Sequence, residues 1–295
     1  MTDTAVTATF NPAIARRKLT GTLFHGLCLA AIGILLLFLL LLLVDILSRG
    51  LPWLDPQFLT GVPSRRPERA GVLPALVGSL EIGAIVALLT FPIGVAAAIY
   101  FVEYAPDNRV NRLLQTNIGN LAGVPSIIYG LLGLAVFVQL LQLGRTVIAA
   151  ALTLTLLILP VVIIASIEAL KAVPTAQREG AYALGATRWQ MVRGSVLPAA
   201  APAIMTGIIL AMARAIGEAA PLLIIGGVGF VTFLPTPFEG AYTVLPLQIF
   251  DWAKRPQDDF SAIASAAIIV ILVLMLILNG LALLIRARLS RHIQW

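Results

Sequence analysis

Six long apolar stretches constrain this chain more than any other feature of its sequence. They cover residues 22–47, 75–102, 118–142, 146–169, 199–226 and 262–286. Each is long enough to cross the ~30 Å hydrocarbon core of a bilayer as a helix. Only 12% of the residues are charged, well below the ~25% usual in soluble domains. The sequence therefore predicts an all-α polytopic membrane protein with six transmembrane helices, in which internal prolines bend the helices.

The distribution of Lys and Arg predicts the orientation of these helices. With the N-terminus inside the cell, the inner segments hold twelve basic residues and the outer segments seven, while Arg214 lies within a span. By the positive-inside rule, we expect both termini to be cytoplasmic. This orientation also places the loop 170–198, between the fourth and fifth spans, in the cytoplasm. The net charge of +6 then reports topology rather than a nucleic-acid partner.

We expect residues 1–74 to comprise a cytoplasmic segment, the first transmembrane helix and an outer loop. Residues 75–295 then form the transmembrane domain. The first apolar run, 27–43, is longer than the ~7–15 residues of a signal-peptide core, and no small-residue cleavage site follows it. The outer segments 48–74 and 227–261 are rich in Pro, Gly and aromatic residues. They are expected to be ordered extracytoplasmic loops, and the sequence leaves open whether they dock a partner or only connect helices.

The sequence lacks the motifs for ATP binding, disulfide bonds and metal binding. A P-loop requires G-x-x-x-x-G-K followed by Ser or Thr, whereas the three lysines, Lys18, Lys171 and Lys254, precede Leu, Ala and Arg. The chain is therefore not expected to be an enzyme, and ATP and Mg²⁺ would be bound by a separate ATPase. One cysteine and two histidines at opposite ends of the chain suggest neither a disulfide framework nor a metal site.

A polar run from Glu179 to Pro198 interrupts the apolar sequence between the fourth and fifth spans. Pro174 can start a short helix, Gly185 can end it, and Thr187 can cap a second helix over 188–192. Apolar and aromatic side chains that could anchor a partner at this bend are Tyr182, Leu184, Trp189 and Met191. The run is interpreted as a docking element, the alternative being a plain surface loop.

Arg214 and Glu218 form the second candidate site, in the predicted fifth span. Ionisable groups within a membrane are costly and often mark a transport pathway. Their spacing of four residues places both on one face of a helix, where they can pair. Arg214 would offer a forked donor to an oxyanion, and Glu218 would orient it or accept a proton from the anion. The alternatives are an ion pair that only braces the helices, or a charged side chain that extends from the cytoplasmic half of the span toward the membrane surface. Glu81 and Asp45 are interpreted as interfacial.

The polar run resembles the EAA loop of binding-protein-dependent ABC importers, in which E-A-A is followed by three residues, Gly, nine residues and I-x-L-P. Here Gly180 replaces the first Ala and Ser195 replaces the Ile. The segments 123–133, 213–222 and 245–257 are similar to stretches of phosphate importer permeases, the last to the PstA-type subunit. The resemblance covers roughly 75–290.

This resemblance implies an inner-membrane permease subunit that moves phosphate by alternating access. The implied partners are a second permease of the PstC type, two ATP-binding subunits and an extracytoplasmic phosphate-binding protein. Arg214 and Glu218 would line the substrate pathway. The residues that would couple to the ATPase are Glu179, Gly180, Ala181, Gly185, Thr187, Trp189, Leu197 and Pro198.

Two other functions stay open at this point. The cargo of such an importer could be molybdate, sulfate, phosphonate or an organic solute. An ion-coupled secondary carrier is the alternative from another class, but such carriers commonly contain repeated halves, and no convincing internal repeat is present.

Overall fold

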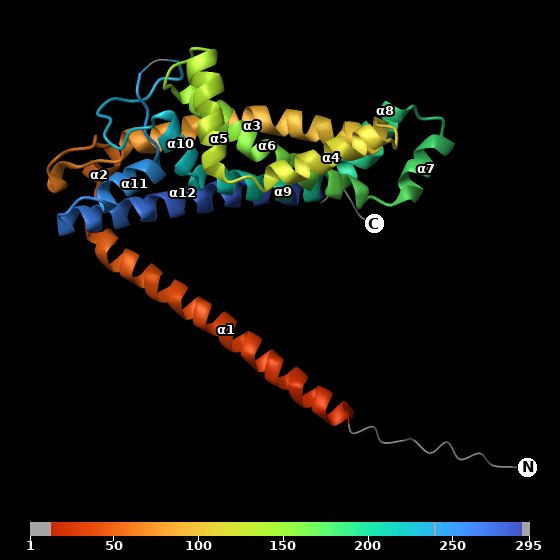
Figure 1. The fold of residues 1–295 in the computed structure, drawn as a ribbon, viewed down its shortest axis with the longest axis horizontal. Coiled ribbons are helices and arrows are strands. Elements are labelled where there is room, and N and C mark those ends of the chain that lie inside the picture. The colour runs from red at the N-terminus through yellow and green to blue at the C-terminus, as the bar shows by residue number, and fades with distance from the viewer. Residues whose placement is uncertain (1–12, 239, 291–295) are drawn as a thin grey trace, which may run out of the picture. The chain divides into compact units, whose positions relative to one another are not determined.

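The computed structural model describes residues 13–238 and 240–290 and divides them into two compact units, with the division between Ser48 and Arg49 (Figure 1). The described residues of the first unit all belong to helix α1, which runs from Ala13 to Gly50. Nearly every residue from Leu27 to Val44 is apolar, so α1 is apolar on all its faces. Such a helix suits a lipid environment. It contains the predicted first span.

Four long helices form the centre of the second unit: α3 (Leu73–Ile99), α6 (Val147–Lys171), α9 (Leu197–Gly217) and α12 (Asp258–Ser290). Helix α6 packs against both α3 and α9, and α9 packs against α12. Most of α6 is buried, including Leu154, Ile158 and Val162. The central position of α6 explains why its sequence is largely apolar and has no polar stripe along its length.

Short elements lie at the two ends of this unit. Helices α7 (Thr175–Ala183) and α8 (Arg188–Met191) lie at one end, and α2 (Pro56–Thr60) and α11 (Leu245–Ala253) at the other (Figure 1). The remaining elements are the 3-10 turns Leu51–Trp53 and Pro67–Arg69, α4 (Arg109–Ala122), α5 (Ser126–Gly133), α10 (Ala220–Ile225) and the π-helical segments Tyr100–Tyr104, Leu134–Leu140 and Val192–Val196.

The predicted fold class is confirmed. Within the described residues, five helices are long and apolar enough to cross a membrane, and a bent pair makes a sixth span if it is counted as one. Pro92 and Pro160 lie inside α3 and α6, as expected. The two segments predicted to lie outside contain short helices, and Phe58 of α2 packs on Trp252 of α11 with ring centroids 6.0 Å apart. Both segments are therefore packed structure.

The predicted third span, 118–142, is wrong as a single helix. The chain instead forms α4 and then α5 with its π-helical continuation, and these two parts are bent by 101°. The bend lies at Gly123-Val124-Pro125. Pro125 has no N–H to donate and disfavours helical geometry at Val124, and Gly123 adds backbone freedom. Hydropathy detected the apolar content of this region but not its change of direction.

The predicted fifth span, 199–226, is also corrected at both ends. A continuous helix begins at Arg188 and ends at Gly217, so α8 is the start of this span rather than a separate short helix. The wider π-helical turns at Val192–Val196 come just before Pro198, where they relieve the clash of the proline ring with the preceding turn. At the other end, the chain leaves the helix at Glu218 and restarts as α10, which has Pro221 in its first turn.

Candidate functional site

The end of α7 is built by a glycine in a left-handed conformation. Gly185 has φ +80°, and its N–H donates to the carbonyl of Tyr182 at 2.9 Å. The next N–H, of Ala186, donates to the carbonyl of Ala181 at 3.1 Å. These two bonds form a Schellman motif, which satisfies carbonyls that the helix end leaves free. The predicted break at Gly185 is therefore present and has a defined geometry.

The start of α8 is closed by a capping box. The backbone N–H of Gln190 donates to the hydroxyl oxygen of Thr187 at 3.4 Å. In return, the N–H of Thr187 donates to the side-chain oxygen of Gln190 at 2.8 Å. This reciprocal pair stabilises a helix start and confirms the cap expected at Thr187. Only three residues, 184–186, lie between α7 and the capping residue, so the bend is tight.

Three apolar side chains are exposed around this bend. The exposed fraction is 45% for Tyr182, 90% for Leu184 and 55% for Trp189. Met191 was expected to join them, but it is 1% exposed and belongs to the main core. Because Met191 lies in the first turn of the long helix of the fifth span, it faces inward with Val192. The α7–α8 tip, defined as Tyr182, Leu184 and Trp189, is therefore an apolar surface on a structured element.

The other residues predicted to couple to the ATPase fall into two groups. Glu179, Gly180, Gly185, Thr187 and Pro198 are exposed. Ala181 and Leu197 pack against the core. Thus the first group is free to contact a partner, while the second fixes the element to the helices beneath it.

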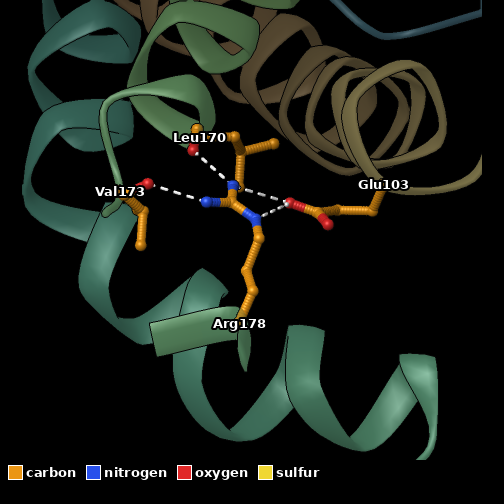
Figure 2. A network of polar contacts seen from close by, with 4 residues as sticks. All are labelled: Glu103, Leu170, Val173 and Arg178. Atoms are coloured by element: carbon orange, nitrogen blue, oxygen red, sulfur yellow. Dashed lines mark hydrogen bonds and ion pairs between the residues drawn. The ribbon is translucent and has the colours of Figure 1, made fainter. Parts of the chain in front are cut away.

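A largely buried ion pair, which no sequence pattern predicted, holds α7 in place (Figure 2). The Nη2 and Nε atoms of Arg178 donate to one oxygen of Glu103 at 2.8 and 3.1 Å. The same guanidinium donates to the carbonyls of Leu170 and Val173 at 2.9 and 2.7 Å. Glu103 lies 75 positions from Arg178 in the chain, and no local pattern links the two. The only sequence signal was that opposite charges follow the predicted second and fourth spans.

The second candidate site lies where α9 ends. The Nε atom of Arg214 lies 3.3 Å from a carboxylate oxygen of Glu218. The spacing predicted that Glu218 would lie on the same helix as Arg214. Instead, Glu218 follows the end of α9 and has an extended backbone conformation (φ −77°, ψ 120°). The side chain of Arg214 is 43% exposed and that of Glu218 18% exposed. Within the described part of the chain, this contact uses only Nε and leaves the two Nη atoms of Arg214 available to another acceptor.

The two helix breaks of this unit are joined by close packing. Helix α5 follows the first break and α10 follows the second, and these two helices contact one another along their lengths. At the centre of the contact, a Cβ added to Gly130 would lie 2.8 Å from the Cα of Pro221. Only glycine permits this approach. The backbone that follows Arg214 is therefore held in place by α5, the second half of the bent α4–α5 pair.

A separate groove between α3, α9 and α12 has a volume of about 320 Å³. Its lining is apolar, with Phe91, Met212 and Leu278 among the residues, and its polar members are Ser79 and Asn279. No charged side chain lines it. A charged solute would lose its hydration there without compensation, so the groove does not suit an ionic substrate.

Comparison with known families decides what kind of protein carries these features. Residues 90–291 match the family of binding-protein-dependent transport system inner membrane components. The chain belongs to this family. It is an inner-membrane, multi-pass ABC transporter permease, a non-catalytic component. Permeases of this family work with ATPase subunits and a binding protein.

Two relatives of this permease cover most of its length. The probable ABC transporter permease protein YqgI of Bacillus subtilis is 35% identical over 89% of this chain and 94% of its own. The phosphate transport system permease protein PstA 1 of Mycobacterium tuberculosis is 34% identical over 90% of this chain and 88% of its own. The permease is thus similar both to a relative whose name states a cargo and to one whose name does not.

The fold of the permease is also similar to that of solved importers. A chain of a bacterial ABC transporter that imports alginate aligns with a TM-score of 0.66 at 19% identity, covering 94% of this chain and 99% of that chain. A chain of the MetNI methionine transporter aligns with a TM-score of 0.55 at 21% identity, covering 74% and 94%. These likenesses establish the ABC importer permease fold.

The conformation of Gly185 makes the bend of the permease sensitive to substitution. In Gly185→Val no atom obstructs the new Cβ, but a left-handed conformation costs other residues about 1–2 kcal/mol. Local opening should therefore increase roughly five- to thirtyfold. We expect trypsin to cleave the purified variant after the exposed Arg188 correspondingly faster than the wild type.

Gly180→Ala is the matched control for this prediction. Gly180 lies inside α7 with open space around it, and Ala favours a helix by about 0.8–1 kcal/mol over Gly. Cleavage of this variant should be no faster than that of the wild type. Equal cleavage rates for Gly185→Val and Gly180→Ala would contradict the role of the left-handed bend.

Proposed function

We propose that this chain is the PstA-type permease subunit of an ATP-driven phosphate importer. The Arg214–Glu218 pair carries the proposal, because it places a permanent positive charge beside a carboxylate at a broken span. Charged groups within a membrane span are costly and are usually tied to a pathway. The similarity to PstA 1 of Mycobacterium tuberculosis, a phosphate transport system permease protein by name, supports the choice of cargo.

The chemistry of the pair suits a protonated tetrahedral oxyanion. The guanidinium of Arg214 presents donors in a planar fork that matches two oxygens of such an anion. Glu218 can accept a hydrogen bond only from a ligand that brings a proton. At neutral pH phosphate brings one and sulfate does not, so the carboxylate favours phosphate by repelling a fully ionised anion.

The uncovered side of α9 is the proposed lining of the translocation path. Leu210 is 68% exposed, and Arg214 and Gly217 are exposed on the same side of the helix. This unit covers the opposite side of α9, where Ile208, Ala211 and Ala215 are buried. A second permease subunit of the PstC type, facing this side, would enclose the path between the two chains.

The α7–α8 tip is the proposed contact with one of two ATP-binding subunits. Exposed aromatic and aliphatic groups on a rigid element are typical anchors of protein interfaces. Closure of the ATPase dimer would move the loop 170–198 and, with it, the helices of the transmembrane domain 75–295. Arg214 would then face the two sides of the membrane in turn, receiving phosphate from an extracytoplasmic binding protein.

Another oxyanion is the second candidate cargo, because YqgI is named only as a probable ABC transporter permease. Uptake of radiolabelled phosphate by cells with and without this chain, in competition with sulfate and molybdate, tests the proposal. Loss of phosphate uptake without the chain, unaffected by the other two anions, is the expected result. Unchanged phosphate uptake without the chain would overturn it.

Substitution of Arg214 separates substrate contact from bracing. Hydrogen bonds to charged groups contribute about 1.5–3 kcal/mol, so Arg214→Gln should lower phosphate uptake roughly tenfold or more. Arg214→Lys keeps the charge but loses the fork, and we expect an intermediate loss. Membrane abundance, measured by immunoblot, should stay at the wild-type level in both variants.

The double variant Arg214→Gln, Glu218→Gln is the control for bracing. If the pair only braced the fold, each single change would leave an unpaired charge and lower abundance, whereas the double change would restore both abundance and uptake. Restored uptake in the double variant would therefore defeat the substrate-contact role. A stable but inactive double variant is the expected outcome.

The proposed orientation, with both termini cytoplasmic, predicts which cysteines are accessible from outside. Arg65 and Leu184 are both exposed, and Cys28 can be replaced by Ser to give a background without thiols. In intact spheroplasts, a membrane-impermeant maleimide should label Arg65→Cys but not Leu184→Cys. In inside-out vesicles the pattern should reverse. Labelling of Leu184→Cys in intact spheroplasts would contradict the orientation drawn from the basic residues.

A further inference from the structure

We propose that Arg178 and Glu103 form a positioning pair that fixes α7 to the ends of α3 and α6, so that displacement of α7 moves both helices. The inference rests on the proposed role of the α7–α8 tip as the contact with an ATPase. It adds two residues outside that tip. These residues contact neither substrate nor ATP, but they determine whether movement of α7 is transmitted to α3 and α6. The EAA-like spacing assigns no role to either of them.

The guanidinium of Arg178 bridges three elements of the chain (Figure 2). Arg178 lies on α7, and its guanidinium donates to Glu103, in the π-helical segment that follows α3. It also donates to the carbonyl of Leu170, in the last turn of α6, and to that of Val173, just after α6. A cation beside the carboxyl end of a helix stabilises that end of the helix dipole. One side chain thus satisfies the end of α6 and anchors it to α3.

The burial of this pair separates it from ordinary surface ion pairs. The side chain of Glu103 is 6% exposed and that of Arg178 is 18% exposed. In the nearby pair Lys171–Glu168, the side chains are 54% and 67% exposed. Exposed pairs of that kind contribute little, whereas breaking a buried pair leaves a charge without compensation. The geometry at Arg178 is therefore strongly enforced.

Helix α7 depends on this pair for its attachment to α3 and α6, because its other packing is on α8 and the π-helical segment Val192–Val196. It contains no fully buried residue, and Ala181 is its member that packs against the main core. A nine-residue helix held by so little apolar contact would otherwise be free to pivot. The ion pair fixes the position of α7 relative to the transmembrane helices α3 and α6.

The end of α3 also receives a contact from α8. The guanidinium of Arg188 lies over the ring of Tyr104, 5.4 Å from its centroid. Glu103 and Tyr104 are neighbours in the same π-helical segment. Both short helices of the bend are therefore connected to one point of α3, and α3 packs along α6, which packs on α9. This chain of contacts runs from the tip to the helix that carries Arg214.

Arg178→Lys is the variant that tests the pair. Lysine keeps the charge, but one ammonium group cannot reproduce a planar fork aimed at three acceptors. The tagged complex is purified with its ATPase and reconstituted in liposomes with the binding protein. ATP hydrolysed per phosphate imported should rise at least about threefold, a change typical of residues that carry coupling between sites. Abundance and copurification of the ATPase should stay unchanged.

Glu168→Gln is the matched control, because it removes the carboxylate of an exposed ion pair at the same end of the unit. Its ratio of ATP to phosphate should equal that of the wild type. Glu103→Gln should behave like Arg178→Lys. If Arg178→Lys instead lowers abundance while the remaining protein keeps the wild-type ratio, the pair is only structural and the proposal fails.

A distance measurement tests the pair independently of transport. Spin labels at Ala183→Cys and Val110→Cys, both at exposed positions in a background without Cys28, report the position of α7 relative to α4. We expect one narrow distance distribution for wild type and Glu168→Gln and a broad one for Arg178→Lys. A narrow distribution in Arg178→Lys would overturn the proposal even if the cargo or the ATPase contact had been assigned wrongly. Absence of ATP-driven phosphate uptake by the wild-type complex would count only against the proposed function.

Discussion

The structure depends on one constraint: in hydrocarbon, every backbone N–H and C=O needs a partner within the protein. Long helices satisfy this requirement, and α6 does so at the centre of the unit, with α3 and α9 packed on it. The two interruptions, at 123–125 and 218–219, are covered by each other's continuations, since α5 and α10 pack together through Gly130 and Pro221. Irregular backbone is tolerated in membranes where protein buries it or where it borders a water-filled cavity.

The Arg214–Glu218 pair lies beside one of these interruptions. Arg214 lies in the last turn of α9; a charged side chain within a span costs up to about 2.5–3.5 kcal/mol on insertion scales, the value for the span centre. A contact of 3.3 Å between half-exposed and largely buried groups offsets part of that cost but leaves little net stabilisation. The apolar packing of α9 on α6 and α12 must therefore hold the pair in place. The pair therefore does not stabilise the fold; the fold holds it in place at a cost in stability. Such a cost is consistent with a functional role for the pair.

The sequence was sufficient for features that depend on local composition. Apolar length predicted the spans, and the chemistry of Gly185 and Thr187 predicted the bend, because caps and left-handed turns are determined by neighbouring residues. Features that depend on tertiary packing were missed. The bend at Pro125 and the break at Glu218 leave the mean hydropathy of their windows unchanged. Met191 was placed on the surface because its burial depends on α8 continuing into α9, and the Arg178–Glu103 pair joins residues 75 positions apart.

The continuity of the helix from Arg188 to Gly217 gives the proposed coupling a simple mechanical basis. Arg188 directly follows the capping residue of the bend, and Arg214 is 26 residues later (214 − 188), which corresponds to roughly 39 Å at a rise of ~1.5 Å per residue. One element therefore carries the proposed ATPase contact at one end and the proposed anion contact at the other. The π-helical turns at Val192–Val196 interrupt the regular α-helical hydrogen-bond pattern of this element, as π-helical turns often do at functional sites. Contacts on both sides of them, from Arg188 to Tyr104 and from α9 to α6, allow the helix to tilt as a whole instead of flexing at that point.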